Sequence, residues 1–186
     1  EHLPESLRKL LESGSVSVEN YAGNGYIRLP EGAIVVPANG KRSTERSAEI
    51  GQSVISLDLC LDYERSSRIV LAPSLECSEQ NLQQAVGLFQ SLGKHVSVIK
   101  DIVGMVLTSM VAMLANEGSL LVQEEVADVA AVNLAMRKGV NYPLGPLEWA
   151  EQWGWDSVVE TLDNLQQVNA ERYQTSEWLR QKIKLS

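Results

Sequence analysis

The sequence of 186 residues has few of the residue types that mark common catalytic sites. It contains two histidines and two cysteines, and neither an HExxH nor a CxxC motif is present. The usual sequence signs of a zinc or redox centre are therefore lacking. No serine occupies a GxSxG nucleophile elbow. These absences argue against a metal or hydrolase site built from a local motif, and they predict reduced, partly buried thiols at Cys60 and Cys77.

Basic residues are also scarce, with 16 Lys and Arg against 24 Asp and Glu, which gives a net charge of -8. A chain of this charge is repelled by phosphate backbones and anionic lipids, so we expect no nucleic-acid or membrane partner. The apolar stretch 102–122 is interrupted by Asn116 and Glu117 and has no basic anchor beyond Lys100. We therefore expect a buried helix there. The free thiols predict a cytoplasmic protein.

The apolar residues that are present, within a 44% hydrophobic composition, divide the chain at Asp101. Before Asp101, a short helix at 4–14 and a hairpin or loop containing Val16 and Val18 lead to a strand at 26–29. Strands then alternate with helices, which indicates a small parallel α/β layer. The predicted strands are 33–36, 54–57, 69–71 and 96–99, and the predicted helices between them are 43–50 and 78–92.

After Asp101 the sequence predicts helices only. Their expected ranges are 103–124, 128–138, 146–153, 157–168 and 176–184. Asp128, Asp156 and Ser176 have the side chains that cap helix N-termini, and we expect each to begin a helix. The tryptophans of the last helices predict packing or an interface rather than a cofactor site.

Three local features are candidate sites. Gly40-Lys41 follows a strand as in a phosphate-binding loop, but Val35 replaces the first glycine of that motif, and an ordinary strand-to-helix turn explains the same residues. His95 is expected at a solvent-exposed strand edge, and His2 lies near the terminus. Asn116-Glu117, a polar pair in an apolar setting, must form hydrogen bonds. It either lines a pocket or ties helices together.

Residues 136–149 encode a stiff link between two helices. Arg137 and Lys138 suit a helix C-terminus, and we expect Gly139 to supply a left-handed cap. Pro143 cannot continue the helix. Pro146, after Gly145, suits the first position of the next helix.

This link, from Ala135 to Leu147, resembles the signature of the C-terminal helical domain of NAD-dependent 3-hydroxyacyl-CoA dehydrogenases. Further resemblances occur at Gly93-Lys94 through Asp101 and Gly104, at Asn116-Glu117, and at Arg172-Tyr173 with Trp178-Leu179-Arg180. Residues 7–14 and Gly25-Tyr26 resemble the tail of a preceding helical domain. The chain is therefore similar to the second repeat of two-repeat enzymes of the phenylacetate-degradation type, and we expect it to be a piece of a longer polypeptide.

The resemblance implies a truncated Rossmann-like parallel sheet followed by an α-helical domain. The implied domains are a tail and connector at 1–32, a degenerate α/β unit at 33–100 and the helical domain at 101–186. The implied parent reaction oxidises 3-hydroxyacyl-CoA to 3-oxoacyl-CoA with NAD. The implied partners are the N-terminal catalytic half of the same polypeptide and a second copy, bound through the helical domain.

Departures from the family pattern predict that this portion is inactive. Aligned from Gly93-Lys94, the catalytic histidine falls near Leu59 and the glutamate near Val70, and the NAD fingerprint is missing. We therefore expect no catalytic, cofactor-binding or metal residues, and no NAD bound to this fragment. The family's asparagine at the start of the long helix falls at Thr108. Thr108, Asn116 and Glu117 are candidate lining residues of an acyl-CoA pocket, so the alternative is a degenerate acyl-CoA-binding module without turnover.

Overall fold

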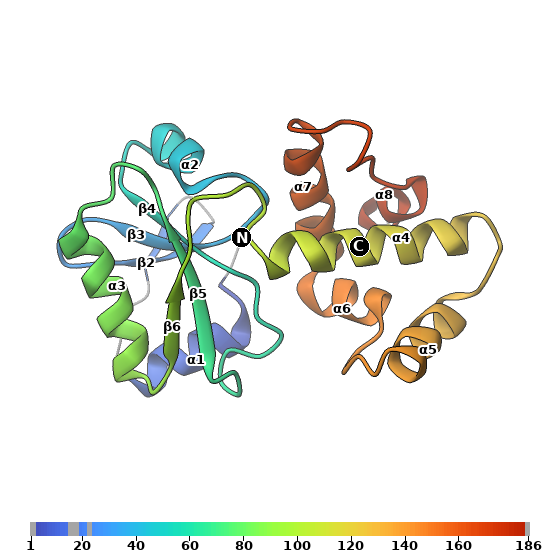
Figure 1. Cartoon of the computed structure of the whole chain (residues 1–186), viewed down its shortest axis with the longest axis horizontal. Helices are drawn as coiled ribbons and strands as arrows, with labels where there is room; N and C mark the ends of the chain where they lie inside the picture. The colour runs from blue at the N-terminus through green and yellow to red at the C-terminus, as the bar shows by residue number, and fades with distance from the viewer. Residues whose placement is uncertain (1–2, 15–18, 22–23, 185–186) are drawn as a thin grey trace. The chain divides into compact units, whose positions relative to one another are not determined.

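A computed structural model describes residues 3–14, 19–21 and 24–184 (Figure 1). The chain divides after Met105 into two compact units, residues 1–105 and 106–186. The predicted boundary at Asp101 lies just inside the first unit. Val16 and Val18, which were predicted to lie in a hairpin or loop, fall outside the described residues.

The first unit is a sheet with helices packed on it. Its elements follow the chain in this order: α1 (Glu5–Ser13), β1 (Glu19–Tyr21), β2 (Asn24–Arg28), β3 (Ile34–Pro37), α2 (Ser43–Ile50), β4 (Val54–Leu57), β5 (Arg68–Pro73), α3 (Glu79–Ser91) and β6 (His95–Val98). The strands lie side by side in chain order. The β3–β4 and β5–β6 pairs are parallel, whereas β4–β5 is antiparallel. The predicted fold class is confirmed, but the sheet is mixed rather than parallel throughout.

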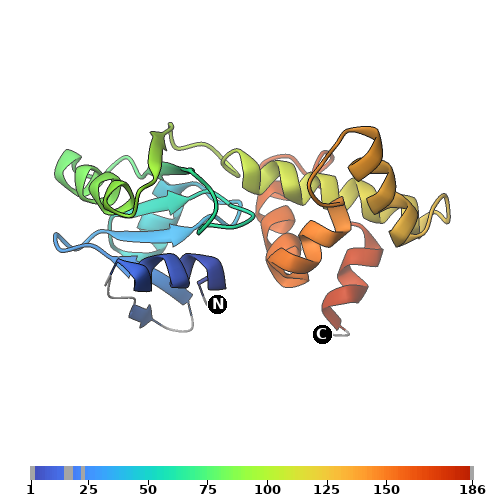
Figure 2. The same ribbon diagram turned by 90° about the horizontal axis from the view of Figure 1, so that it is seen from below.

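Side-chain alternation along the strands separates the two faces of the sheet. The face that packs against α1 and α3 carries Val35, Ile55 and Leu71. The opposite face carries Ile34, Val36 and Val54. Leu7 and Leu11 of α1 are fully buried in the first of these clusters, so the segment predicted as a separate tail packs within the α/β unit (Figure 2). Its origin in a preceding helical domain stays a prediction.

The segment after β6 packs against the same unit. Met105 is 4% exposed and packs with Ala38 and Ala72. The Gly104 N–H donates to the Gly40 carbonyl oxygen at 2.9 Å. Gly104 and Met105 have φ of 72° and 48°, so two successive residues adopt the left-handed conformation. This turn ends the α/β unit.

The second unit is all helical, as predicted. It consists of α4 (Leu107–Gln123), α5 (Val129–Gly139), α6 (Pro146–Trp153), α7 (Trp155–Gln166) and α8 (Glu177–Lys184). α4 contacts each of the other helices. Its small residues Ala112 and Ala115 are fully buried against Val158 and Leu162 of α7. No helix in the described part of the chain is long and apolar enough to span a membrane.

Two predicted helix ends need correction. α7 begins at Trp155, directly after Gly154, so Asp156 lies in the first turn and does not cap the helix. α5 continues through Gly139, and the left-handed residue is Asn141, with φ of 57°. The other caps agree with the sequence. Asp128 accepts from the Ala131 N–H at 2.7 Å, and the Ser176 hydroxyl accepts from the Leu179 N–H at 3.2 Å.

Candidate functional site

The start of α2 was the candidate phosphate-binding turn, and its N–H groups already have protein partners. The carboxylate of Asp101 accepts from the Ser43 N–H at 2.7 Å and from the Thr44 N–H at 2.9 Å. Glu45 accepts from the Arg42 N–H at 3.1 Å. An anion at a helix N-terminus needs these donors free. The turn is therefore an ordinary strand-to-helix connection whose cap comes from a distant carboxylate, and it does not fit a cofactor phosphate.

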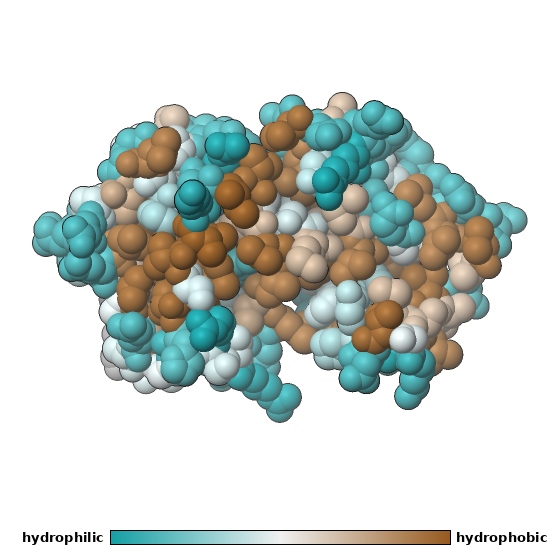
Figure 3. All heavy atoms as spheres, in the orientation of Figure 1, coloured by the Kyte–Doolittle hydropathy of each residue, from teal (hydrophilic) through white to brown (hydrophobic). Residues whose placement is uncertain are grey.

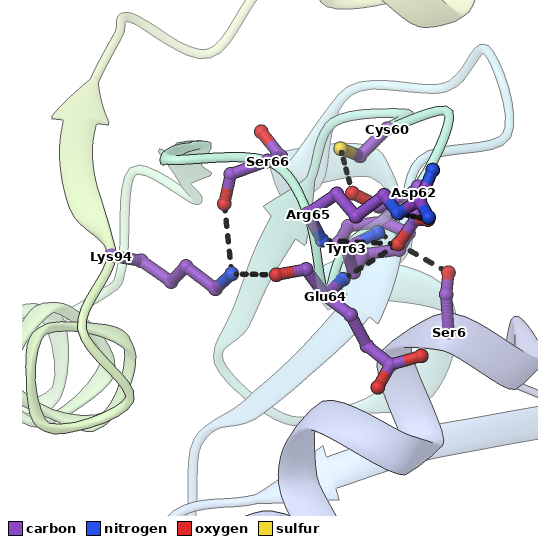
Figure 4. Close-up of polar contacts among 8 residues, drawn as sticks. All are labelled: Ser6, Cys60, Asp62, Tyr63, Glu64, Arg65, Ser66 and Lys94. Atoms are coloured by element: carbon purple, nitrogen blue, oxygen red, sulfur yellow. Dashed lines mark hydrogen bonds and ion pairs between the residues drawn. The ribbon is translucent and has the colours of Figure 1, made fainter.

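A loop of residues 58–66 follows β4, and Lys94 fastens it from the start of β6 (Figure 4). The Lys94 ammonium donates to the carbonyl oxygens of Glu64 at 2.7 Å and Ser66 at 2.8 Å. Lys94 is only 8% exposed, so these carbonyls replace water around its charge. The Gly93-Lys94 pair that contributed to the family resemblance thus has a structural role.

The same loop is held by further polar contacts (Figure 4). Asp62 accepts from the N–H groups of Glu64 at 2.9 Å and Arg65 at 3.1 Å, as aspartate does in a turn. The Ser6 hydroxyl of α1 accepts from the Tyr63 N–H at 3.2 Å. Cys60 donates its thiol hydrogen to the Asp62 carbonyl oxygen at 3.4 Å. The Ser6 bond connects α1 to the loop, and the Asp62 and Cys60 bonds lie within the loop.

Tyr63 and Asp58 are buried polar residues that the sequence did not single out. The Tyr63 hydroxyl donates to the Asp58 carbonyl oxygen at 2.8 Å, and the two residues are 1% and 2% exposed. Burial raises the pKa of Tyr63 far above its usual value, and nearby Cys60 and Asp58 raise this pKa further. The Asp58 carboxylate accepts from the Leu59 N–H at 2.9 Å. The sequence signal that could have identified Asp58 is its position directly after the apolar strand 54–57.

The other reactive side chains of this unit are its two cysteines and His95. Cys60 and Cys77 are free thiols of intermediate exposure, as predicted. Burial raises the pKa of Cys77, which keeps this thiol protonated and poorly nucleophilic. His95 is exposed on β6. His2 lies outside the described residues. Within the described ranges, no three histidine, cysteine or acidic side chains gather as metal ligands.

In the helical unit, Asn116 ties α4 to the segment before α8. Its side-chain amide donates to the Gln174 carbonyl oxygen and accepts from the Ser176 N–H, both at 2.9 Å. The Ser119 hydroxyl lies 2.6 Å from the Ser176 hydroxyl. Asn116 is 2% exposed, and both of its polar atoms are satisfied. Of the two roles open for this residue, the structure supports the structural tie.

The three predicted pocket residues do not lie together. Thr108 is fully buried at the start of α4, whereas Glu117 is exposed. These two residues are nine positions apart, and at about 100° per residue they point to opposite sides of a helix. Glu117 therefore lies away from Thr108 and Asn116.

The link between α5 and α6 is fixed by contacts that its own residues did not reveal. The buried Asn133 of α5 accepts from the Leu147 N–H at 3.0 Å and so caps α6. Glu148 accepts from the Gly145 N–H at 2.7 Å and pairs with Arg137 at 3.4 Å. A Cβ at Gly145 would lie 2.5 Å from the Asn133 Cα, so only glycine fits there. Pro146 occupies the first turn of α6, as predicted.

The last two helices are joined by charged and aromatic contacts. Arg180 of α8 forms a bidentate pair with Asp163 of α7, at 2.5 and 3.2 Å. Trp155 and Trp178 pack edge to face, and the Lys182 ammonium lies 4.7 Å from the Trp178 ring centre. These tryptophans are packing residues, in agreement with the sequence prediction.

Comparison with protein families gives a separate match for each part of the chain. Residues 35–102 match the 3-hydroxybutyryl-CoA dehydrogenase reduced Rossmann-fold domain. Residues 104–186 match the C-terminal domain of 3-hydroxyacyl-CoA dehydrogenase. The first match confirms that the α/β unit is a shortened Rossmann-like domain.

Curated relatives agree with these matches. The chain is 31% identical to 3-hydroxyadipyl-CoA dehydrogenase of Escherichia coli over 154 residues, which is 82% of this chain and 31% of that protein. It is 32% identical to 3-hydroxybutyryl-CoA dehydrogenase of Bradyrhizobium diazoefficiens over 74 residues, covering 40% of this chain and 25% of that protein. The chain thus spans a third or less of the length of these relatives.

Solved structures resemble the chain in the same way. A crystal structure of 3-hydroxybutyryl-CoA dehydrogenase from Escherichia coli K12 matches with a TM-score of 0.82 and 29% identity, over 91% of this chain and 35% of that one. (S)-3-hydroxybutyryl-CoA dehydrogenase from Ralstonia eutropha matches with a TM-score of 0.68 and 20% identity, over 86% of this chain and 57% of that one, which shows a shared fold. With both domain families matched in succession along its length, the chain belongs to the 3-hydroxyacyl-CoA dehydrogenase family.

Proposed function

We propose that this chain is a non-catalytic portion of an NAD-dependent 3-hydroxyacyl-CoA dehydrogenase of the phenylacetate-degradation type. The whole enzyme would be a cytoplasmic oxidoreductase that converts 3-hydroxyacyl-CoA into 3-oxoacyl-CoA. The name of the Escherichia coli relative, 3-hydroxyadipyl-CoA dehydrogenase, supports a substrate of this class. In this proposal the N-terminal half of the polypeptide performs the reaction, and the present portion is its scaffold.

One observation carries the assignment of inactivity. Counted back from Gly93-Lys94 in the family resemblance, the catalytic histidine would fall near Leu59 and the glutamate near Val70, and neither side chain can accept a proton. Removing the proton of the substrate hydroxyl requires a base within hydrogen-bond reach. His95, the one histidine in the described part of the chain, is exposed on β6 and has no acidic neighbour in the sequence.

The α/β unit also supports the proposal that this chain binds no NAD. The N–H groups at the start of α2 are satisfied by Asp101 and Glu45, and no glycine-rich fingerprint is present. NAD would then be held by the catalytic half, where it would accept the hydride.

We assign two partners to the helical unit: the catalytic half of the polypeptide and a second copy of the chain. Exposed apolar residues on its surface support this assignment, since Met110 and Leu134 are 52% and 50% exposed. Large exposed apolar side chains that gather on one surface mark interaction sites.

NADH oxidation with acetoacetyl-CoA tests the proposed inactivity. We expect the chain alone to stay at the background rate, because it lacks both base and cofactor site. The full-length Escherichia coli relative, assayed in parallel, is the positive control. Turnover by the chain alone would refute the assignment.

The second candidate is an acyl-CoA-binding module without turnover. Its support is Thr108, a fully buried hydroxyl at the start of α4, where the family has an asparagine. Calorimetry with acetoacetyl-CoA distinguishes the two. Saturable binding with a micromolar Kd that is lost in the Thr108→Val variant would favour the binding module. Injection heats no larger than the heat of dilution would favour the scaffold.

A further inference from the structure

Helix α2 packs on the sheet through polar side chains. Its buried residues are Ser43, Arg46 and Ser47. None of the apolar clusters in the described part of the chain includes a residue of α2, whereas α1 and α3 both contribute to one of them. Ile50, its one large apolar residue, is 42% exposed, and α2 lies at one side of the sheet, apart from α1 and α3 (Figure 1). Because apolar burial is the main favourable term in folding, α2 is attached less firmly than the other two helices.

Hydrogen bonds hold α2 in place instead. The Ser43 hydroxyl donates to the Ala72 carbonyl oxygen at 2.7 Å and lies 2.8 Å from the Ser56 hydroxyl. The Arg46 guanidinium donates to the Pro37 carbonyl oxygen at 2.5 Å. Water makes equivalent bonds to these groups when the helix is detached, so each bond adds little net stability.

The sheet beneath α2 contains a hydroxyl that opening would hydrate. Ser74 follows Ala72 by two residues and lies on the same face of the sheet. The next residue, Leu75, donates its N–H to the Thr44 hydroxyl of α2 at 3.0 Å. Ser74 is 4% exposed, and its hydroxyl has no hydrogen-bond partner among the described residues. A buried polar group without a partner destabilises the closed state, which reduces the free energy needed to open α2.

The segment that leaves the α/β unit is attached mainly to α2 and to the turn before it. Asp101 accepts from the first two N–H groups of α2. Gly104 donates its N–H to Gly40 in the turn, and Met105 packs against the same turn. Ile102 is 42% exposed and contributes less packing, and apolar side chains are visible over β6 and the segment after it in Figure 3. Detachment of α2 would therefore remove most of the contacts of this segment.

From these contacts we propose that residues 38–51 and 100–105 open together in one cooperative step, while the rest of the sheet stays folded. The Asp101 carboxylate holds both segments closed, because it is the direct bond between them and carries a full charge. Met105 favours opening, since its left-handed φ of 48° costs energy in a residue other than glycine.

Opening changes the connection between the two compact units. In the closed state Val106 alone separates the buried Met105 from the start of α4 at Leu107. In the open state residues 100–106 form a free chain that can span up to about 23 Å. A fixed connection thus becomes a flexible tether.

Hydrogen exchange of single amides, followed by NMR on the whole chain, tests the cooperative step. The N–H groups of Gly51, at the end of α2, and Gly104 should have the same protection factor, well below those of β4 and β5. Asp101→Ala should lower both protection factors equally, by about tenfold or more, because two bonds to a charged group are lost. Asp128→Ala removes the matching cap of α5 and is the control, which should lower protection in α5 only.

Three outcomes of the exchange experiment would contradict the proposal. Faster exchange of Gly51 without Gly104 would show that α2 frays alone. Equally faster exchange throughout β4 and β5 would show that Asp101→Ala destabilises the whole unit. Wild-type amides of α2 that exchange as slowly as those of β5 would show that no separate opening occurs.

Trypsin provides an independent measurement. Arg46 is 8% exposed within α2, so cleavage after it requires the helix to open. Asp101→Ala should raise this cleavage rate by the same factor as the exchange rate of Gly51. Cleavage after Arg65, whose side chain is 90% exposed, is the internal control and should keep the wild-type rate. An unchanged rate at Arg46 would refute the cooperative opening. Neither measurement depends on enzymatic activity, so the outcome is separate from that of the dehydrogenase assay.

Discussion

At the scale of single residues, adjacent polar side chains in α4 have different roles. Asn116 is buried and uses both ends of its amide, whereas Glu117 is exposed. The sequence shows that both are polar residues in an apolar stretch, but one step along a helix rotates a side chain by about 100°. Only packing decides which of the two faces inward.

Asn116→Ala should therefore destabilise the helical unit by about 2 kcal/mol, since it leaves the Ser176 N–H and the Gln174 carbonyl without their partner. Urea unfolding followed by circular dichroism measures this loss. Asn116→Asp keeps the acceptor for Ser176 and loses the donor. Glu117→Ala is the neighbouring control and should change stability by less than about 0.5 kcal/mol. Equal effects at 116 and 117 would contradict the assigned tie.

Ionisation of Tyr63 should make the stability of the α/β unit depend on pH in the alkaline range. Burial raises the pKa of its phenol in the folded state, while an unfolded tyrosine ionises near pH 10. A raised folded pKa contributes stability that is complete below about pH 10 and is lost as the pH rises further. We expect the free energy of unfolding to fall above this pH. Tyr63→Phe should reduce that fall, and Tyr142→Phe, at a half-buried site, should not. A Tyr63→Phe variant with the wild-type pH profile would contradict this account.

At the scale of elements, the link between α5 and α6 shows how much of a turn's conformation its own sequence predicts. Proline at the first turn of α6 agrees with its sequence preference. Gly139 was predicted to adopt the left-handed conformation, yet α5 continues through it and Asn141 takes that conformation instead. Gly145 is required for another reason, the close approach of Asn133 from α5. A turn sequence predicts that a helix ends there, but tertiary contacts determine which residue adopts the left-handed conformation.

Alanine substitution of the two glycines distinguishes these roles. Gly139→Ala should stabilise the protein by about 0.5–1 kcal/mol, because the site is helical and nothing lies within 4 Å of the new methyl group. Gly145→Ala should destabilise it by about 2 kcal/mol or more, because the Cβ would overlap Asn133. Thermal unfolding of both variants measures the difference. A stabilising Gly145→Ala would show that the link can relax.

At the scale of the whole molecule, the division into an α/β part and a helical part was readable from periodicity, and so was nearly every helix and strand. Strand direction was not, because β4 and β5 are joined by a loop of residues 58–67 in which neither helical nor strand periodicity appears. Contacts from distant parts of the chain fix the course of this loop: Lys94 donates to the Glu64 and Ser66 carbonyl oxygens, and Ser6 accepts from the Tyr63 N–H. The antiparallel pair follows from that course.

The sequence by itself determined the family, the order of the elements and the position of the 136–149 link. These depend on local periodicity, turn residues and motif spacing, which are properties of residues close together in the sequence. Tertiary structure alone decided that Asp101 caps α2, that Asn133 caps α6 and that Asn116 turns inward. Each of these bonds joins residues between 14 and 60 positions apart, and burial gives them their strength. The link between helices thus marks the family in the sequence, while its angle is held by an asparagine that lies outside it.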